Sequence, residues 1–200
     1  EYGQLEGQAY DVTERVHGGN LMDFEVSTSD FRTIHRIVEE ISSALAALLE
    51  VGLQHRALHP EKVLIRTIDP LDLVITGFES SRLSEADLEI ESLLEVSRYT
   101  APEAVMGAVT SASDWWGLGM MLLGLVTGNQ CFDGVDDQLF LIHVQGNGAP
   151  IPTDLDPRVD LLLRGLLATD RMARWQWKEV REWLDGGSPS APAKVDNNSG

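Results

Sequence analysis

The 200-residue chain is 43% hydrophobic and carries 32 acidic against 15 basic residues, for a formal net charge of −17. A chain of this length and apolar content can bury one sizeable core, which predicts a single main domain. Binding to nucleic acid or to an anionic membrane surface is excluded, because it needs clusters of Lys and Arg that the sequence lacks.

The cysteine content and the apolar runs bear on the cellular compartment. The single cysteine, Cys131, cannot form an internal disulfide, which is typical of a reducing compartment. The longest apolar stretch, Leu118 to Val126, is too short to span a bilayer. No secretory signal opens the chain. We therefore expect a cytoplasmic protein without a membrane partner.

The first fifty residues predict a short extended segment and a long helix. Residues 9–16 are β-compatible and lead into two glycines that permit a sharp turn. Ser29 or Asp30 is a suitable N-cap for a helix that runs to Leu49 and ends before Gly52. Apolar residues recur in it at steps of three and four, which predicts one buried face.

Two strands and several helices are predicted further along. Residues 63–65 and 73–76 are short apolar runs joined by an Asp-Pro turn at 68–72, which predicts a pair of strands. Residues 84–95 open with a capping-box pattern and predict a short acidic helix. Apolar periodicity predicts helices over the remaining segments, 113–128, 137–144 and 156–168.

Five short patterns that occur in order are the most informative part of the sequence. The first, over residues 53–65, is Leu-Gln-His-Arg-Ala-Leu-His-Pro-Glu-Lys-Val-Leu-Ile. The others are Gly77-Phe78-Glu79, Arg98-Tyr99-Thr100-Ala101-Pro102-Glu103, Asp114-Trp115-Trp116-Gly117-Leu118-Gly119 and Asp170-Arg171-Met172-Ala173-Arg174-Trp175. In order and spacing they resemble the large, C-terminal lobe of protein kinases, from about Tyr10 to Leu184.

The resemblance implies a mainly α fold with short β hairpins, the kinase-like C-lobe of an α+β superfamily, with the N-lobe largely absent from this chain. Residues 1–16 would be a remnant of small-lobe strands and hinge, with Glu14 and Val16 as hinge candidates for meeting an adenine. Residues 17–185 would form the large lobe. Residues 186–200 have no apolar period and predict a disordered tail or linker.

Six residues hold positions that the family uses to build its scaffold: His55, Arg56, Phe78, Glu103, Asp114 and Arg174. The resemblance implies that Asp114 accepts hydrogen bonds from the backbone of the catalytic loop and that Arg174 forms an ion pair with Glu103. His55 would stack with a phenylalanine, Phe78, that packs in the core. Arg56 would meet a carboxylate of the acidic segment that follows.

Four positions that carry the chemistry of active kinases hold other residues here: Ala57, His59, Lys62 and Gly77. In the family, the position of Ala57 is the Asp that receives the hydroxyl proton, and those of Lys62 and Gly77 hold magnesium ligands. These departures favour a catalytically inactive pseudokinase that is not an enzyme and needs no metal or cofactor. It would act as a regulatory scaffold for a protein partner, within a larger polypeptide.

Two alternatives retain nucleotide chemistry. One is an unorthodox kinase or nucleotidyl transferase that recruits Glu79, Glu61 or Asp69 for a metal ion. The other binds nucleotide with the Lys62 ammonium in place of magnesium as the counter-charge to phosphate. His59 is a candidate general base, although a loop histidine that simply fills the family's lysine position is the simpler interpretation.

Overall fold

The computed structural model of the chain describes residues 2–5, 8–11, 13–24, 30–78, 81–83 and 97–192. Its helices are α1 (Phe31–Glu50), α2 (Pro102–Val105), α3 (Ser111–Thr127), α4 (Asp137–Asn147), α5 (Pro157–Leu166) and α6 (Trp177–Leu184). Its strands are β1 (Tyr2–Leu5), β2 (Gln8–Asp11), β3 (Leu53–Gln54), β4 (Val63–Ile68), β5 (Leu71–Ile75) and β6 (Arg82–Leu83). The predicted mainly helical fold with short hairpins is confirmed. None of the described helices is long and apolar enough to cross a membrane.

The strands form three separate antiparallel pairs, β1 with β2, β3 with β6 and β4 with β5. The predicted β4–β5 pair is present, but its strands extend further, so that only Asp69 and Pro70 separate them. The extended segment predicted over 9–16 lies earlier, at Gln8–Asp11, because it pairs with Tyr2–Leu5. The described residues 13–17 carry no strand.

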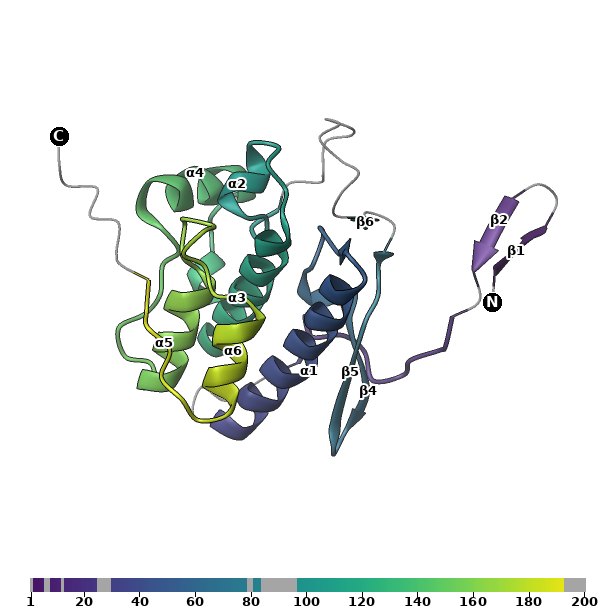
Figure 1. The fold of residues 1–200 in the computed structure, drawn as a ribbon, viewed down its shortest axis with the longest axis horizontal. Helices are drawn as coiled ribbons and strands as arrows, with labels where there is room; N and C mark the ends of the chain where they lie inside the picture. The colour runs from purple at the N-terminus through teal and green to yellow at the C-terminus, as the bar shows by residue number, and fades with distance from the viewer. Residues whose placement is uncertain are drawn as a thin grey trace.

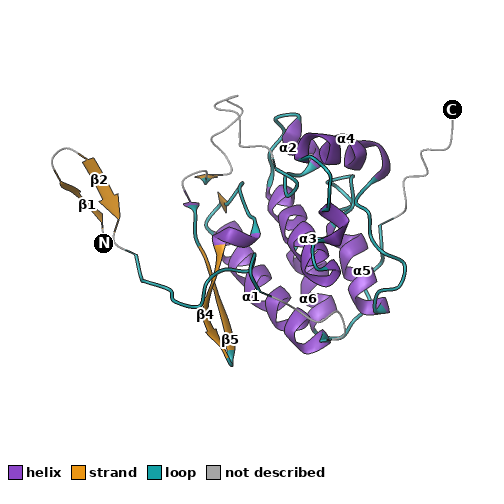
Figure 2. Ribbon diagram, turned by 180° about the vertical axis from the view of Figure 1, so that it is seen from behind, coloured by secondary structure: helices purple, strands orange, loops and turns teal. Residues whose placement is uncertain are grey.

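Helix α1 matches its prediction closely. The Asp30 carboxylate accepts a hydrogen bond from Thr33 N at 3.2 Å, which caps the helix at one of the two predicted positions. Its buried face consists of Ile34, Ile37, Val38, Ile41, Ser42, Leu45 and Ala46. This face packs against α3, α6 and β5, and Figures 1 and 2 show the β4–β5 hairpin beside α1.

Helix α3 is the centre of the domain, with almost every residue buried. It lies between α1 and α5 (Figure 1). Its N-cap is Thr110, whose backbone N–H donates to Ser113 Oγ at 3.1 Å, so the helix starts at Ser111 and not at the predicted residue 113. The helix begins earlier than predicted because Ser113 lies in its first turn, where its hydroxyl accepts the hydrogen bond of the Thr110 N–H.

One close approach in this core leads to a stability prediction. A Cβ on Gly165 of α5 would lie 2.1 Å from the ring of Trp175, which is buried. Gly165→Ala should therefore lower the free energy of unfolding by about 1–3 kcal/mol through overpacking. Gly146→Ala is the matched control, because a Cβ there meets nothing within 4 Å and should raise helix stability by up to ~1 kcal/mol. Urea denaturation of both variants measures the difference, and equal effects would contradict the prediction.

Part of the segment after α6 packs against the domain. Pro189 is buried, and Trp175 Nε1 donates to the Ser190 carbonyl at 3.1 Å. The structure thus differs from the expected disordered tail over residues 186–192. The buried Pro189 and the hydrogen bond to the Ser190 carbonyl fix this stretch, although it has no apolar periodicity. Residues 193–200 lie outside the described part of the chain.

Candidate functional site

The loop of residues 55–62 is fixed to the first turn of α3. The backbone N–H groups of His55 and Arg56 donate to the two oxygens of the Asp114 carboxylate, at 2.8 and 2.7 Å. Asp114 is 7% exposed, and its burial raises the pKa of the carboxyl although both bonds act to lower it. Arg56 has a φ of 71°, a left-handed conformation that is unusual for a residue with a side chain. The loop is therefore held in a specific shape by one buried carboxylate.

His55 lies behind this loop and is fully buried. Its Nε2 lies 2.8 Å from the Thr76 carbonyl, and its ring centroid lies 5.0 Å from that of Phe78. Phe78 itself is 42% exposed, so the prediction that it packs in the core differs from the structure. The chain turns at Gly77, with a φ of 83°, and leaves the ring edge-on to His55 at the margin of the core.

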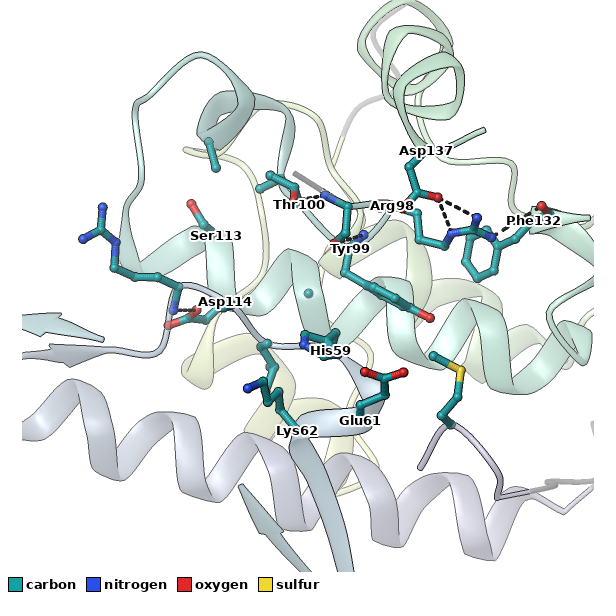
Figure 3. A pocket seen from close by; sticks show the side chains of 18 of the residues that line it. His59, Glu61, Lys62, Arg98, Tyr99, Thr100, Ser113, Asp114, Phe132 and Asp137 are labelled. Carbon is teal, nitrogen blue, oxygen red and sulfur yellow. Dashed lines mark hydrogen bonds and ion pairs between the residues drawn. The ribbon is translucent and has the colours of Figure 1, made fainter. Parts of the chain in front are cut away.

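A cleft of about 720 Å³ opens between this loop and the segment 97–101 (Figure 3). Three of the four departures from the family, Ala57, His59 and Lys62, line it, together with Arg56. The cleft thus lies where the sequence patterns place the chemistry.

Lys62 and Gly77 meet at one end of this region. A Cβ added to Gly77 would lie 2.3 Å from Lys62 Cδ and 2.8 Å from Nζ. The backbone also connects the two segments, because Thr76 N donates to the Lys62 carbonyl at 2.8 Å. The Lys62 side chain therefore fills the space that a side chain at position 77 would need.

Aromatic rings from both segments line the cleft. The rings of His59 and Tyr99 stack with centroids 6.2 Å apart and planes 27° apart. Burial raises the pKa of the Tyr99 hydroxyl to about 12, so the phenol stays neutral at physiological pH. Next to it, Arg98 Nε donates to Asp137 Oδ1 at 2.7 Å and links the wall to the start of α4 (Figure 3).

An ion pair behind the cleft joins the end of this wall to the C-terminal helices. Arg174 donates to both oxygens of Glu103, at 2.6 and 2.9 Å, and to the carbonyls of Ala112 and Ala168. Its guanidinium carbon lies 5.0 Å from the ring centroid of Trp116. Burial acts to raise the pKa of Glu103, but the hydrogen bonds and charge of Arg174 outweigh it and lower that pKa.

The lowered pKa of Glu103 predicts a pH dependence of stability. Because the folded pKa lies below the usual value of 4.5, the carboxylate stabilises the fold above that pH and loses its contribution as pH falls through the folded pKa. The stability difference between the wild type and Glu103→Gln should therefore shrink on acidification below about pH 4.5. Urea denaturation from pH 7 to pH 3 measures it, and a difference that stays constant would contradict the assignment.

The remaining predicted site residues are dispersed. Glu61 is exposed on the rim of the cleft, whereas Asp69 is in the β4–β5 turn and is not part of its lining. Glu14 pairs with Arg66 at 2.6 Å. Glu79 lies outside the described residues, as does the predicted helix over 84–95.

The structure does not test the predicted contact between Arg56 and a carboxylate. The buried Arg56 Nε has no hydrogen-bond partner in the part of the chain that the structure describes. The expected carboxylate partner in the acidic segment would fall among residues that are not described.

Within the described ranges, no three His, Cys, Asp or Glu side chains are grouped so that they could hold a metal ion.

Three residues that line the cleft were not predicted to lie there: Arg98, Tyr99 and Asp137. Arg98 and Tyr99 precede the Ala-Pro-Glu pattern, so that pattern was a signal that could have placed them at the site. The partner of Arg98 is 39 residues away, and no local pattern indicates that contact.

Comparison with known proteins gives consistent matches. The family model described as protein kinase domain matches residues 3–183. The chain is 28% identical over 201 residues to the serine/threonine-protein kinase YPK3 of Saccharomyces cerevisiae, a match that covers 92% of this chain and 38% of that protein. It is 30% identical over 167 residues to the serine/threonine-protein kinase AtPK1/AtPK6 of Arabidopsis thaliana, which covers 82% and 35%. The chain thus spans little more than a third of the length of these relatives.

The fold matches solved structures as well. A crystal structure of the Rad53 kinase domain and SCD2 has a TM-score of 0.73 at 22% identity, with 92% of this chain and 69% of that chain covered. The same protein in complex with AMPPNP gives a TM-score of 0.68 at 22% identity, with 86% and 67% covered. The resemblance to a kinase large lobe that the sequence patterns indicate is confirmed.

One prediction is corrected by these matches. The departures at Ala57, His59, Lys62 and Gly77 favour a protein that is not an enzyme, but the relatives whose matches cover most of this chain are named serine/threonine-protein kinases. Substitutions at these four positions carry less weight than a family match that extends over residues 3–183.

Proposed function

Because the chain belongs to the protein kinase domain family, we propose that it forms the large lobe of a kinase-type domain that binds a nucleoside triphosphate and transfers its terminal phosphoryl group to a protein hydroxyl. The observation that carries this proposal is the fixed loop in front of an open cleft. Asp114 holds the loop at 2.8 and 2.7 Å, and the cleft of about 720 Å³ gives room for a substrate segment.

The charges at the cleft support a role in handling phosphate. Phosphoryl transfer depends mainly on positioning and on positive charge near the phosphate oxygens. Lys62 and Arg56 both line the cleft, from the two ends of loop 55–62. Glu61, an exposed carboxylate that lines the cleft, is a candidate for accepting the proton of the attacking hydroxyl. His59 is a second candidate for the proton, on the same loop.

The proposal also sets an expected rate. Ala57 offers no side chain that could receive the proton of the attacking hydroxyl, and loss of a well-positioned general base costs about 10²–10⁴-fold in rate. Protein kinases typically turn over at about 1–100 s⁻¹. We therefore expect a turnover rate about 10²–10⁴-fold lower, roughly 10⁻⁴–1 s⁻¹.

Transfer of labelled phosphate tests the proposal. The full-length protein is incubated with γ-labelled ATP and a degenerate peptide library that contains Ser and Thr, and label on the peptides is followed. We expect slow transfer that falls in Lys62→Gln and is retained in Lys178→Ala, an exposed lysine on α6. Label no greater than with heat-inactivated protein, or equal label with Lys62→Gln, would contradict the proposal.

A second function, binding of a regulatory protein partner, is favoured by one observation on α4. Leu139 and Ile142 are 63% and 66% exposed and lie three residues apart on one face of this helix, and Val135 before it is 40% exposed. The exposed acids Asp133 and Asp136 adjoin this face. A partner segment with apolar and basic side chains would complement it.

Peptide display tests this second function. Peptides selected on the protein should be rich in apolar and basic residues and should lose binding to Leu139→Glu. They should retain it with Leu49→Glu, a half-exposed leucine on α1. Selected peptides that bind Leu139→Glu unchanged would rule this face out.

A further inference from the structure

The metal site that the family implies does not fit this chain. The family holds magnesium with an Asn and an Asp, both oxygen donors, at the positions of Lys62 and Gly77. Here one position carries a cationic side chain and the other carries none. The described part of the chain also offers no alternative group of three His, Cys, Asp or Glu side chains. A hard cation such as Mg²⁺ therefore lacks its usual oxygen ligands at this end of the cleft.

The two departures are structurally linked. A Cβ at position 77 would lie within 2.8 Å of Lys62 Cδ, Cε and Nζ, so the lysine side chain occupies the space that an Asp at 77 would take. Gly77 also has a φ of 83°, which glycine adopts at no cost. The absence of a side chain at one position thus makes room for the cation at the other.

We propose that the Lys62 ammonium replaces the divalent cation as the counter-charge to the nucleotide's phosphates, so that this site binds a nucleoside triphosphate without magnesium. The inference rests on the proposed function, because it assigns the charge that would hold the ligand of that site. An ammonium is a compact point charge with three donors, and its hydrogen bonds to phosphate oxygens are charge-assisted. Arg56, on the same loop, adds a second positive charge to the cleft.

Nucleotide binding in the presence and absence of magnesium tests the inference. Binding of a fluorescent ATP analogue to the full-length protein is titrated in buffer with EDTA and in buffer with Mg²⁺. We expect equal or tighter binding in EDTA, and a loss of about 10- to 100-fold in Lys62→Gln, which removes charge-assisted bonds. Lys62→Arg should retain binding in EDTA, as should Lys178→Ala, which controls for net charge.

The outcomes separate this inference from the proposed function. Binding that requires Mg²⁺, or that is unchanged in Lys62→Gln, would overturn the inference and leave nucleotide binding intact. Binding in neither buffer would overturn both. Circular dichroism shows whether each variant is folded. Lys62→Arg keeps the positive charge and remains available for comparison if Lys62→Gln does not fold.

The linkage between the two positions gives a second, independent measurement. The double variant Lys62→Asn/Gly77→Asp replaces the cation by two oxygen donors and removes the side chain that would collide. Its nucleotide binding should become dependent on Mg²⁺. In Gly77→Asp alone, the new carboxylate would lie next to the Lys62 ammonium and should weaken binding in EDTA. Binding in EDTA by the double variant that equals that of the wild type would overturn the inference.

Discussion

Replacing Asp114 with Ala should lower the free energy of unfolding by about 3–5 kcal/mol, because it leaves two buried N–H groups without acceptors and creates a cavity. The two groups are the backbone N–H of His55 and of Arg56, now at 2.8 and 2.7 Å from the carboxylate. Arg56 has a φ of 71°, a conformation that needs such support from its surroundings. Urea denaturation followed by circular dichroism measures the loss.

Asp160→Ala is the matched control for this variant. Asp160 also lies on a helix and forms an ion pair, with Arg164 at 2.7 Å, but both side chains are about 30% exposed. A pair of this kind contributes about 0.3–0.5 kcal/mol. If Asp114→Ala cost no more than Asp160→Ala, the assignment of the carboxylate as the anchor of loop 55–62 would be wrong.

Arg174→Ala should cost about 3–5 kcal/mol, because it leaves the partly buried Glu103 carboxylate without its counter-charge. The side chain of Arg174 is 0% exposed and that of Glu103 is 11% exposed, so water cannot readily take the place of the guanidinium. The variant also removes donors from the carbonyls of Ala112 and Ala168. Thermal and urea unfolding measure the effect.

The double variant Arg174→Met/Glu103→Leu distinguishes the value of the pair from the cost of breaking it. Replacement of both charges by apolar side chains of similar size is often neutral or stabilising. We therefore expect the double variant to be more stable than Arg174→Ala. A double variant that is as unstable as Arg174→Ala would mean that the carbonyl bonds, and not the isolated charge, dominate.

Much of the helical scaffold could be predicted because its signals are local. The apolar residues of α1 repeat at helical spacing, and Asp30 precedes them as a cap. Helix α3 is apolar on all sides, which predicts burial on all sides. Its exact start could not be predicted, since Thr110, Ser111 and Ser113 all suit a cap and only the geometry selects Thr110.

Contacts between distant segments could be predicted only where a family pattern supplied them. The Arg174–Glu103 pair spans 71 residues and was expected from the resemblance alone. The contact between Arg98 and Asp137 is not part of any of the sequence patterns, and no local periodicity predicts it. The partial exposure of Phe78 was also not expected, because the sequence does not reveal how the chain turns at Gly77.

At the candidate site, too, the sequence identifies individual residues but not how they contact one another. The sequence identifies Lys62 and Gly77 as departures, but their steric linkage depends on the path of the lysine side chain, which only the structure gives. The prediction that the protein is not an enzyme was wrong because it depended on single positions, whereas the similarity to named kinases extends over most of the chain.

Thermal unfolding of the full-length protein against ATP tests the central claim, that this kinase-type domain binds a nucleoside triphosphate. A ligand at 100 times its dissociation constant adds about 2.7 kcal/mol to the stability of the native state. For a domain of this size the melting temperature should rise by roughly 5–10 °C, since 1 kcal/mol corresponds to a few degrees. A saturable rise in melting temperature is expected in buffer with EDTA. No rise at millimolar ATP, with or without Mg²⁺, would contradict it.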